Sequence, residues 1–156
     1  MNNTRFQKTE NIAQIQLVYV SATTRPFLRA ELADLLLRAR THNSSIEVTG
    51  LLLYHKLSFF QILEGDDRVV VPLYKKIECD PRHDQILMLS RKEVTERNFG
   101  DWSMGFVDLD RESDASLGFR KLLAAKSSFL ALQGDVKLVA KLIDGFQEGR
   151  WRRGIS

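Results

Sequence analysis

The stretch "LSFFQILEG", Leu57–Gly65, decides the fold because it has the composition of a buried strand with one polar residue inside it. The neighbours of Gln61 are aromatic and aliphatic residues of the kind that favours a pleated, packed surface: Phe59, Phe60, Ile62 and Leu63. A buried amide without a hydrogen-bond partner costs roughly 1–3 kcal/mol. We therefore expect a specific partner for Gln61, and its identity bears on function.

The segments around this strand predict a repeated strand–helix order. "VTGLLLYH", residues 48–55, is a strand that forms a hairpin with residues 58–64 through the short link Lys56-Leu57, although the favoured Asn-Gly turn is absent. The other expected elements are a strand at 15–22, a helix at 27–43, a helix at 66–79, strands at 85–94 and 102–110, and two C-terminal amphipathic helices within 113–151.

The order β-α-β-β-α-β-β, followed by α-α, is typical of a ferredoxin-like α+β sandwich. We expect a five-stranded mixed sheet with two helices on one face and the two C-terminal helices covering the other. Strand alternation gives Tyr19 and Gln61 one face, and gives the apolar residues beside them the opposite face. The residues expected on that opposite face are Val18, Val20, Phe60 and Ile62.

Four local signals refine the helices. Leu28 begins an apolar stripe in the first helix, which continues through Leu32, Leu35, Leu36 and Ala39. Asn43 ends that helix, where asparagine tolerates a left-handed turn. Asp66 or Asp67 caps the second helix. Pro72 is tolerated best in a first turn, so we expect this helix to start late or to bend.

Composition indicates a cytoplasmic globular protein without a membrane segment. The chain has 156 residues, 44% of them hydrophobic, 28% charged, and a net charge of +3. Its single cysteine, Cys79, allows no internal disulfide, and the N-terminus lacks the apolar core of a secretory signal. The basic tail around Trp151 is interpreted as a solubilising end, with contact to an acidic partner or to nucleic acid as the alternative. Nucleic-acid binding by the sheet is not expected, because the sheet lacks a basic footprint.

The common catalytic motifs are absent. The sequence has no G-x-G-x-x-G, no Walker-type phosphate loop and no nucleophile elbow, and its three histidines lack zinc spacing. What remains is a set of chemically distinctive side chains that alternation brings together between sheet and helices: Tyr19, Gln61, Trp102 and Met104.

From about Ile15 to about Leu109 the sequence resembles the BLUF family of flavin-binding blue-light sensors. The matching stretches are "LVYVS", "ARTHN", "VTGLLLY", "FFQILEG", "VVVPLYKKIECDPRH" and "RNFGDWSMGF", in this order. The resemblance implies a flavin-binding domain over residues 15–110. Residues 1–14 are polar and aperiodic, which predicts a flexible leader, and the amphipathic pattern after residue 110 predicts a helical extension with a basic tail over 111–156.

The resemblance also implies a non-covalent flavin between the two helices, FAD with FMN or riboflavin as alternatives. Gln61 would bridge the hydroxyl of Tyr19 and the flavin edge, which answers the question of its partner. Asn43 would bind the polar edge of the ring. Arg82 and His83, with Asp80 and Lys76 beside them, would lie near the ribityl and phosphate end. The family's cofactor positions correspond to Tyr19, Leu35, His42, Asn43, Gln61, Ile77, Arg82 and His83, and its photoactive positions to Tyr19, Gln61, Trp102 and Met104.

As a member of this family, the chain would be a photoreceptor and not an enzyme. An electron from Tyr19 and a proton relayed by Gln61 would rearrange the hydrogen bonds at the ring and shift its absorption slightly to the red. The last strand and residues 113–149 would pass the change to a homo-oligomer or a separate downstream protein. The alternatives are a small flavin-dependent oxidoreductase, which NADH would bleach, and a cofactor-free ferredoxin-like binding module, which would be colourless.

Overall fold

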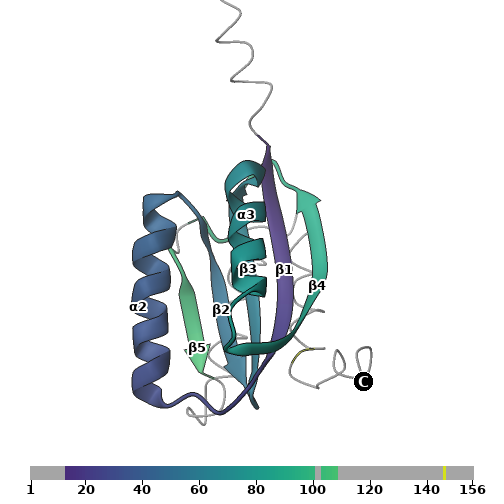
Figure 1. Ribbon diagram of the computed structural model, residues 1–156. Helices are drawn as coiled ribbons and strands as arrows, with labels where there is room; N and C mark the ends of the chain where they lie inside the picture. Colours follow the sequence, from purple (N-terminus) through teal and green to yellow (C-terminus); the bar gives the residue numbers. More distant parts are fainter. Residues whose placement is uncertain (1–12, 101–102, 109–145, 147–156) are drawn as a thin grey trace, which may run out of the picture.

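The computed structural model describes residues 13–100, 103–108 and 146, and within them a five-stranded sheet carries two helices on one face (Figure 1). The strands run in the order β4-β1-β3-β2-β5. Neighbours are antiparallel except for β2 and β5, which are parallel. The elements are β1 Gln14–Thr23, α2 Arg29–Ser45, β2 Thr49–His55, β3 Ser58–Asp66, α3 Asp67–Glu78, β4 His83–Glu93 and β5 Gly105–Asp108. The expected ferredoxin-like mixed sheet is confirmed.

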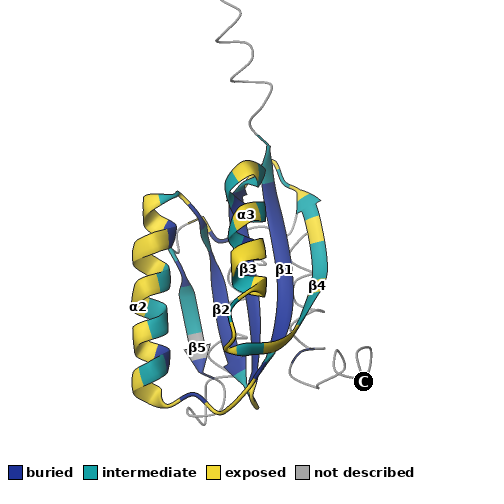
Figure 2. Ribbon diagram, viewed as in Figure 1, coloured by how far each residue is buried: buried dark blue, intermediate teal, exposed yellow. Residues whose placement is uncertain are grey.

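The two faces of the sheet are apolar and separate, as alternation predicts. The face toward α2 and α3 carries the inner cluster, in which Tyr19, Phe59 and Leu63 are buried. The opposite face carries the outer cluster: Val18, Val20, Leu51, Leu53, Phe60, Ile62, Phe99 and Phe146. Figure 2 shows that the central strands β1, β2 and β3 are buried almost throughout, while the helices expose their outward sides.

One residue near the C-terminus is described, and it packs on the outer face. The ring centroid of Phe146 lies 5.4 Å from that of Phe60 and 6.3 Å from that of His55. The expected C-terminal helices otherwise lie outside the described residues. Within the described part of the chain, no helix is long and apolar enough to cross a membrane.

The β2–β3 hairpin turns through two residues with positive φ, Lys56 at 47° and Leu57 at 62°. Positive φ at both central residues is the signature of a type I′ turn, which here forms without asparagine or glycine. The two strands are also held unusually close at Gly50, because a Cβ there would lie 1.8 Å from the carbonyl oxygen of Ile62.

The ends of α2 differ from the prediction. Helix α2 begins at Arg29, and Leu28 is its N-cap with 65% of its surface exposed, so Leu28 is not part of the apolar stripe. The backbone N–H of Leu28 instead donates to Glu31 Oε1. At the other end Asn43 stays helical, and its carbonyl oxygen accepts from the N–H of Val48 at 2.8 Å. The left-handed residue is Glu47, with φ 58°.

Helix α3 begins directly at Asp67, so a late start is wrong. Asp66 is the N-cap, and its carboxylate accepts the backbone N–H of Arg68 at 2.9 Å. Pro72 lies inside the helix and removes one backbone donor there. The final strand is also shorter than expected, because the described β5 starts at Gly105 and Met104 precedes it.

Candidate functional site

A cavity of about 270 Å³ opens between the inner face of the sheet and the helices α2 and α3. Its lining residues come from β1, β2 and β3, from α2 and α3, and from the segment that follows α3. Figure 1 shows both helices on this face of the sheet. All eight residues expected to contact a cofactor line this cavity: Tyr19, Leu35, His42, Asn43, Gln61, Ile77, Arg82 and His83. Lys76 and Asp80, expected at its far end, line it as well.

The floor of the cavity holds a buried tyrosine–glutamine pair. Tyr19 on β1 stands directly opposite Gln61 on β3, and its hydroxyl donates a short hydrogen bond to Gln61 Oε1. Burial raises the pKa of Tyr19 far above its ordinary value, and Tyr74 and Asp80 add to the shift. The hydroxyl therefore stays protonated at neutral pH and remains a donor to Gln61.

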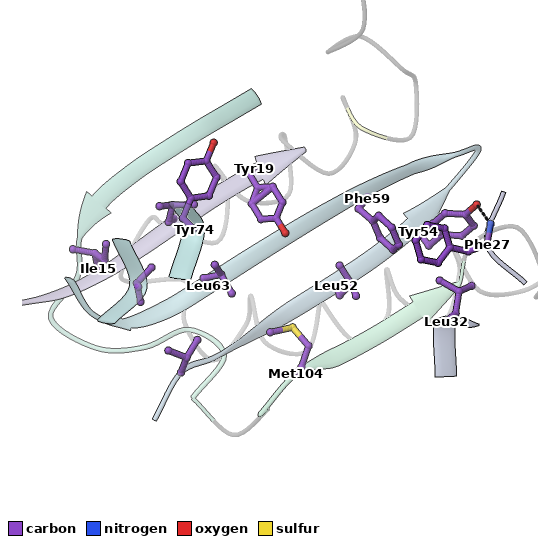
Figure 3. Packing of buried hydrophobic residues seen from close by; sticks show 13 residues of the cluster. Ile15, Tyr19, Phe27, Leu32, Leu52, Tyr54, Phe59, Leu63, Tyr74 and Met104 are labelled. Carbon is purple, nitrogen blue, oxygen red and sulfur yellow. Dashed lines mark hydrogen bonds between the residues drawn. The ribbon is translucent and has the colours of Figure 1, made fainter. Parts of the chain in front are cut away.

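Local sheet geometry orients Tyr19. Val18 opposes Ser90 on β4 while Tyr19 opposes Met88, so one extra residue, Leu89, forms a β-bulge next to the tyrosine. Bulges twist a strand and re-aim its side chains. Figure 3 shows the hydroxyl of Tyr19 directed toward the centre of the inner face, whereas that of the neighbouring Tyr74 points away. The two rings are 5.4 Å apart.

The second partner of Gln61 is Met104. Gln61 Nε2 donates to Met104 Sδ at 3.5 Å, and Met104 is 1% exposed. A thioether can only accept, whereas a hydroxyl can also donate, so this pair of neighbours favours the amide orientation with Oε1 toward Tyr19. Arg40 on α2 fixes the backbone here, since its Nε donates to the carbonyl oxygen of Met104 at 2.9 Å. Trp102, the other residue expected on this segment, lies outside the described residues.

One end of the cavity is polar. Arg82 donates to both carboxylate oxygens of Asp80, from Nε to Oδ1 at 3.0 Å and from Nη2 to Oδ2 at 2.6 Å. This pairing lowers the pKa of Asp80, so the carboxyl is ionised. Burial lowers the pKa of His83, whose ring is therefore neutral at pH 7 and packs edge-on against Phe59 at 6.0 Å. Within the described residues, His83 Nδ1 is buried without a hydrogen-bond partner.

The walls of the cavity come from the facing sides of the helices. Asn43 is buried on α2, whereas His42 beside it is exposed at the cavity's rim. Leu35 on α2 and Ile77 on α3 are half-buried. An apolar slot with a few convergent polar groups is the usual form of a small-molecule site.

Six lining residues were not singled out as contacts from the sequence: Arg38, Ala39, Leu52, Phe59, Leu63 and Leu73. The signal for them was available. Arg38 and Ala39 follow Leu35 at helical spacing on α2, and Leu73 precedes Ile77 by four residues on α3. Leu52 is the β2 partner of Gln61.

Comparison with known proteins identifies a matching family model and several relatives. The family model BLUF, described as sensors of blue light using FAD, matches residues 14–105. The photoactivated adenylate cyclase subunit alpha of Euglena gracilis is 42% identical over 97 residues, which cover 61% of this chain and 10% of that protein. The blue light- and temperature-regulated antirepressor BluF of Escherichia coli K12 is 39% identical over 71 residues, 46% of this chain and 18% of its own length.

Solved structures of similar proteins have the same fold. The dark-state structure of BlrB, a BLUF protein, aligns with a TM-score of 0.64 and 28% identity, covering 89% of this chain and 98% of that one. A bacterial light-regulated adenylyl cyclase aligns with a TM-score of 0.63 and 31% identity, covering 82% of this chain and 36% of that one. The chain spans only about a tenth of the curated cyclases that it matches. With its fold, its cavity and a family match over most of the described residues, the chain belongs to the BLUF family of blue-light sensors that use flavin.

Proposed function

We propose that Tyr19 and Gln61 form the photoactive pair of this sensor and that FAD is its flavin. The single observation that carries the proposal is the buried hydrogen bond from Tyr19 to Gln61 at the floor of the cavity. Both side chains are buried, so neither has bulk water as a competing partner. When bound, the flavin supplies absorption of blue light and, once excited, an acceptor for one electron.

The lining of the cavity fits such a group. Leu35 and Ile77 offer apolar walls from opposite helices, as a flat aromatic ring requires. Asn43 faces the same space with an amide that has no side-chain partner among the described residues, and His83 Nδ1 is an unpaired buried atom at the polar end. Ligand cavities commonly measure about 300–1,000 Å³. At about 270 Å³, this one suits the ring system, and Lys76 and Arg82 in its lining would hold the phosphates.

With the flavin bound, Tyr19 would be the residue that supplies this electron. An oxidised phenol is a strong acid, and the acceptor that its hydroxyl already faces is Gln61 Oε1. The proton therefore moves from Tyr19 to Gln61. When the electron returns to Tyr19, its proton returns as well, so the pair ends with the atoms it started with.

The lasting change is in the Gln61 amide, which ends either rotated relative to its starting orientation or as a different tautomer. Rotation exchanges its donor and acceptor ends, so a different atom faces the cavity and the absorption moves slightly to the red. It also turns Oε1 toward Met104, whose sulfur cannot donate, and the contact seen at 3.5 Å is lost. One such bond is worth on the order of 1 kcal/mol, which is enough to bias a finely balanced element and no more.

We infer that the output is protein contact, through residues 111–156, to a second copy of the chain or to a separate protein. The packing of Phe146 on Phe60 supports this, because Phe60 lies directly before Gln61 on β3 and on the opposite face. We assign no turnover to the domain over residues 15–110. The cyclase activity in the names of the relatives is not carried over, because the match covers about a tenth of their length.

The absorption spectrum of the purified protein tests these proposals. A yellow protein whose absorption shifts reversibly to the red under blue light supports the sensor. Tyr19→Phe and Gln61→Leu should retain the flavin and lose the shift, and a normal shift in either variant would show that the photoactive residues are misassigned. Bleaching by NADH would favour an oxidoreductase, and a colourless protein that takes up no FAD would favour a binding module.

A further inference from the structure

The link between β4 and β5 crosses the whole width of the sheet. β4 and β5 are the two edge strands, four strand spacings apart, or about 19 Å. The chain covers this distance between Glu93 and Gly105. On the way Phe99 is buried in the outer cluster, and Met104 is buried in the inner cluster. The link therefore passes from the outer face of the sheet to the inner face, where it contacts Gln61.

A buried carboxylate holds the link midway. Glu64 on the central strand β3 is 0% exposed. Its Oε1 accepts the backbone N–H of Phe99 at 2.7 Å, and its Oε2 accepts that of Asn98 at 3.0 Å. Gln16 on β1, directly opposite Glu64, donates its Nε2 to Oε2 at 3.0 Å. Burial raises the pKa of the Glu64 carboxyl, but all three partners are donors, which suits the ionised form.

A second set of bonds fixes the same link to the neighbouring strands. Arg97 donates from Nε to Gln14 Oε1 on β1 at 2.8 Å and from Nη1 to Thr49 Oγ1 on β2 at 3.3 Å. The backbone N–H of Val94 donates to the carbonyl oxygen of Gln14. The beginning of the link is thus tied to three strands, and only the stretch from Gly100 to Met104 separates these bonds from the contact with Gln61.

We propose that Glu64 is a positioning residue for the photoactive pair: its carboxylate clamps residues 97–99 against the end of β3 and thereby sets the contact of Met104 with Gln61. Glu64 and Gln61 lie three residues apart on one strand, on opposite faces. The clamp therefore couples the amide on the inner face to a segment that packs in the outer cluster with Phe146. This inference rests on the proposed role of Gln61.

Glu64→Gln is the informative change because it preserves the shape of the side chain. An amide has one acceptor oxygen, and its NH2 group cannot accept from a backbone N–H, so one of the two clamped backbone groups loses its partner. Hydrogen–deuterium exchange in the 156-residue chain measures the loss of protection of these backbone amides directly. We expect the amides of Asn98 and Phe99 to exchange at least about tenfold faster in Glu64→Gln, with or without flavin, which corresponds to about 1.4 kcal/mol in the opening equilibrium.

The second readout is the dark recovery of the absorption shift in the flavin-bound protein. A looser Met104 lowers the barrier to rotation of the Gln61 amide, so recovery should accelerate about tenfold in Glu64→Gln, or about 1.4 kcal/mol in the barrier. Leu87→Ala is the matched control: it removes apolar contact with the outer cluster from β4, opposite Val20 and outside both the link and the bulge beside Tyr19. Its recovery should stay within about twofold of the original protein, a small fraction of that barrier change.

Unchanged exchange at Asn98 and Phe99 together with unchanged recovery in Glu64→Gln would overturn the proposal. Equal acceleration by Leu87→Ala would overturn it as well. If Glu64→Gln does not fold, Arg97→Lys tests the same link, since it keeps the charge but loses the two-point attachment to Gln14 and Thr49. It should change both readouts in the same direction, and unchanged readouts there would overturn the clamp. A protein with no light response at all would contradict the proposed function instead, while exchange in the flavin-free chain would still decide whether the clamp exists.

Discussion

Replacing Tyr19 by phenylalanine removes one hydroxyl from the floor of the cavity and leaves the aromatic ring in place. The ring is almost completely buried, so packing in the inner cluster should be retained. The loss falls on Gln61, whose Oε1 accepts the Tyr19 hydroxyl. Leaving a buried acceptor unpaired costs about 1–3 kcal/mol, and part of this is offset because the hydroxyl itself no longer has to be desolvated. We expect the free energy of unfolding to fall by about 1–2 kcal/mol.

Tyr74→Phe is the matched control for this change. Tyr74 is also buried, its ring lies 5.4 Å from that of Tyr19, and its hydroxyl points away from the cavity floor (Figure 3). Removing that hydroxyl should change the free energy of unfolding by no more than about 0.5 kcal/mol. Chemical denaturation of both variants should be compared at the same free flavin concentration, because ligand binding adds to apparent stability. Equal destabilisation of the two variants, or a Tyr19→Phe protein that keeps its light-induced shift, would refute the reasoning.

Three further changes test other parts of the structure. Leu57→Gly should raise the free energy of unfolding by about 0.5–1 kcal/mol, because it relieves a left-handed residue at φ 62°, and a loss of stability in denaturation would contradict the turn geometry. Gly50→Ala should lower it by about 3 kcal/mol or more, because the added Cβ would meet Ile62 O; a variant that melts like the original protein would exclude this close approach. Asp66→Ala should cost about 1 kcal/mol at neutral pH through loss of the α3 N-cap. The pKa of Asp66 is about 2 in the folded chain and about 3.9 when unfolded. The stability difference between the original protein and Asp66→Ala should therefore be present above about pH 4 and disappear as the pH falls toward 2. Asp66→Asn keeps the cap, so its stability should stay close to that of the original protein at neutral pH.

The part of the fold that depends on strand period could be predicted from the sequence. Alternation placed Tyr19 and Gln61 on one face, and Val18 and Phe60 on the other, and the register confirms both. The helical spacing of residues such as Leu35 likewise placed them on the side that lines the cavity. These assignments succeed because a side chain's face follows from its position within an element and needs no knowledge of distant partners.

Other features depend on contacts that sequence spacing does not encode. The role of Glu64 could not be predicted from the sequence, because its partners Asn98 and Phe99 lie more than thirty residues away along the chain. Met104 was expected within the last strand, yet it precedes β5, because the chain is still crossing from the outer face to the inner face. The end of α2 was assigned to Asn43 from its propensity, but the structure uses Glu47 for the left-handed residue.

The most direct test of the account is the absorption spectrum of the 156-residue protein reconstituted with FAD, recorded in the dark, under blue light and again in the dark. The account predicts a red shift that appears on illumination and decays in the dark, and that is absent from a Gln61→Leu protein with the same flavin content. An unsubstituted protein that binds FAD and shows no shift under blue light, or a Gln61→Leu protein that shifts normally, would contradict it.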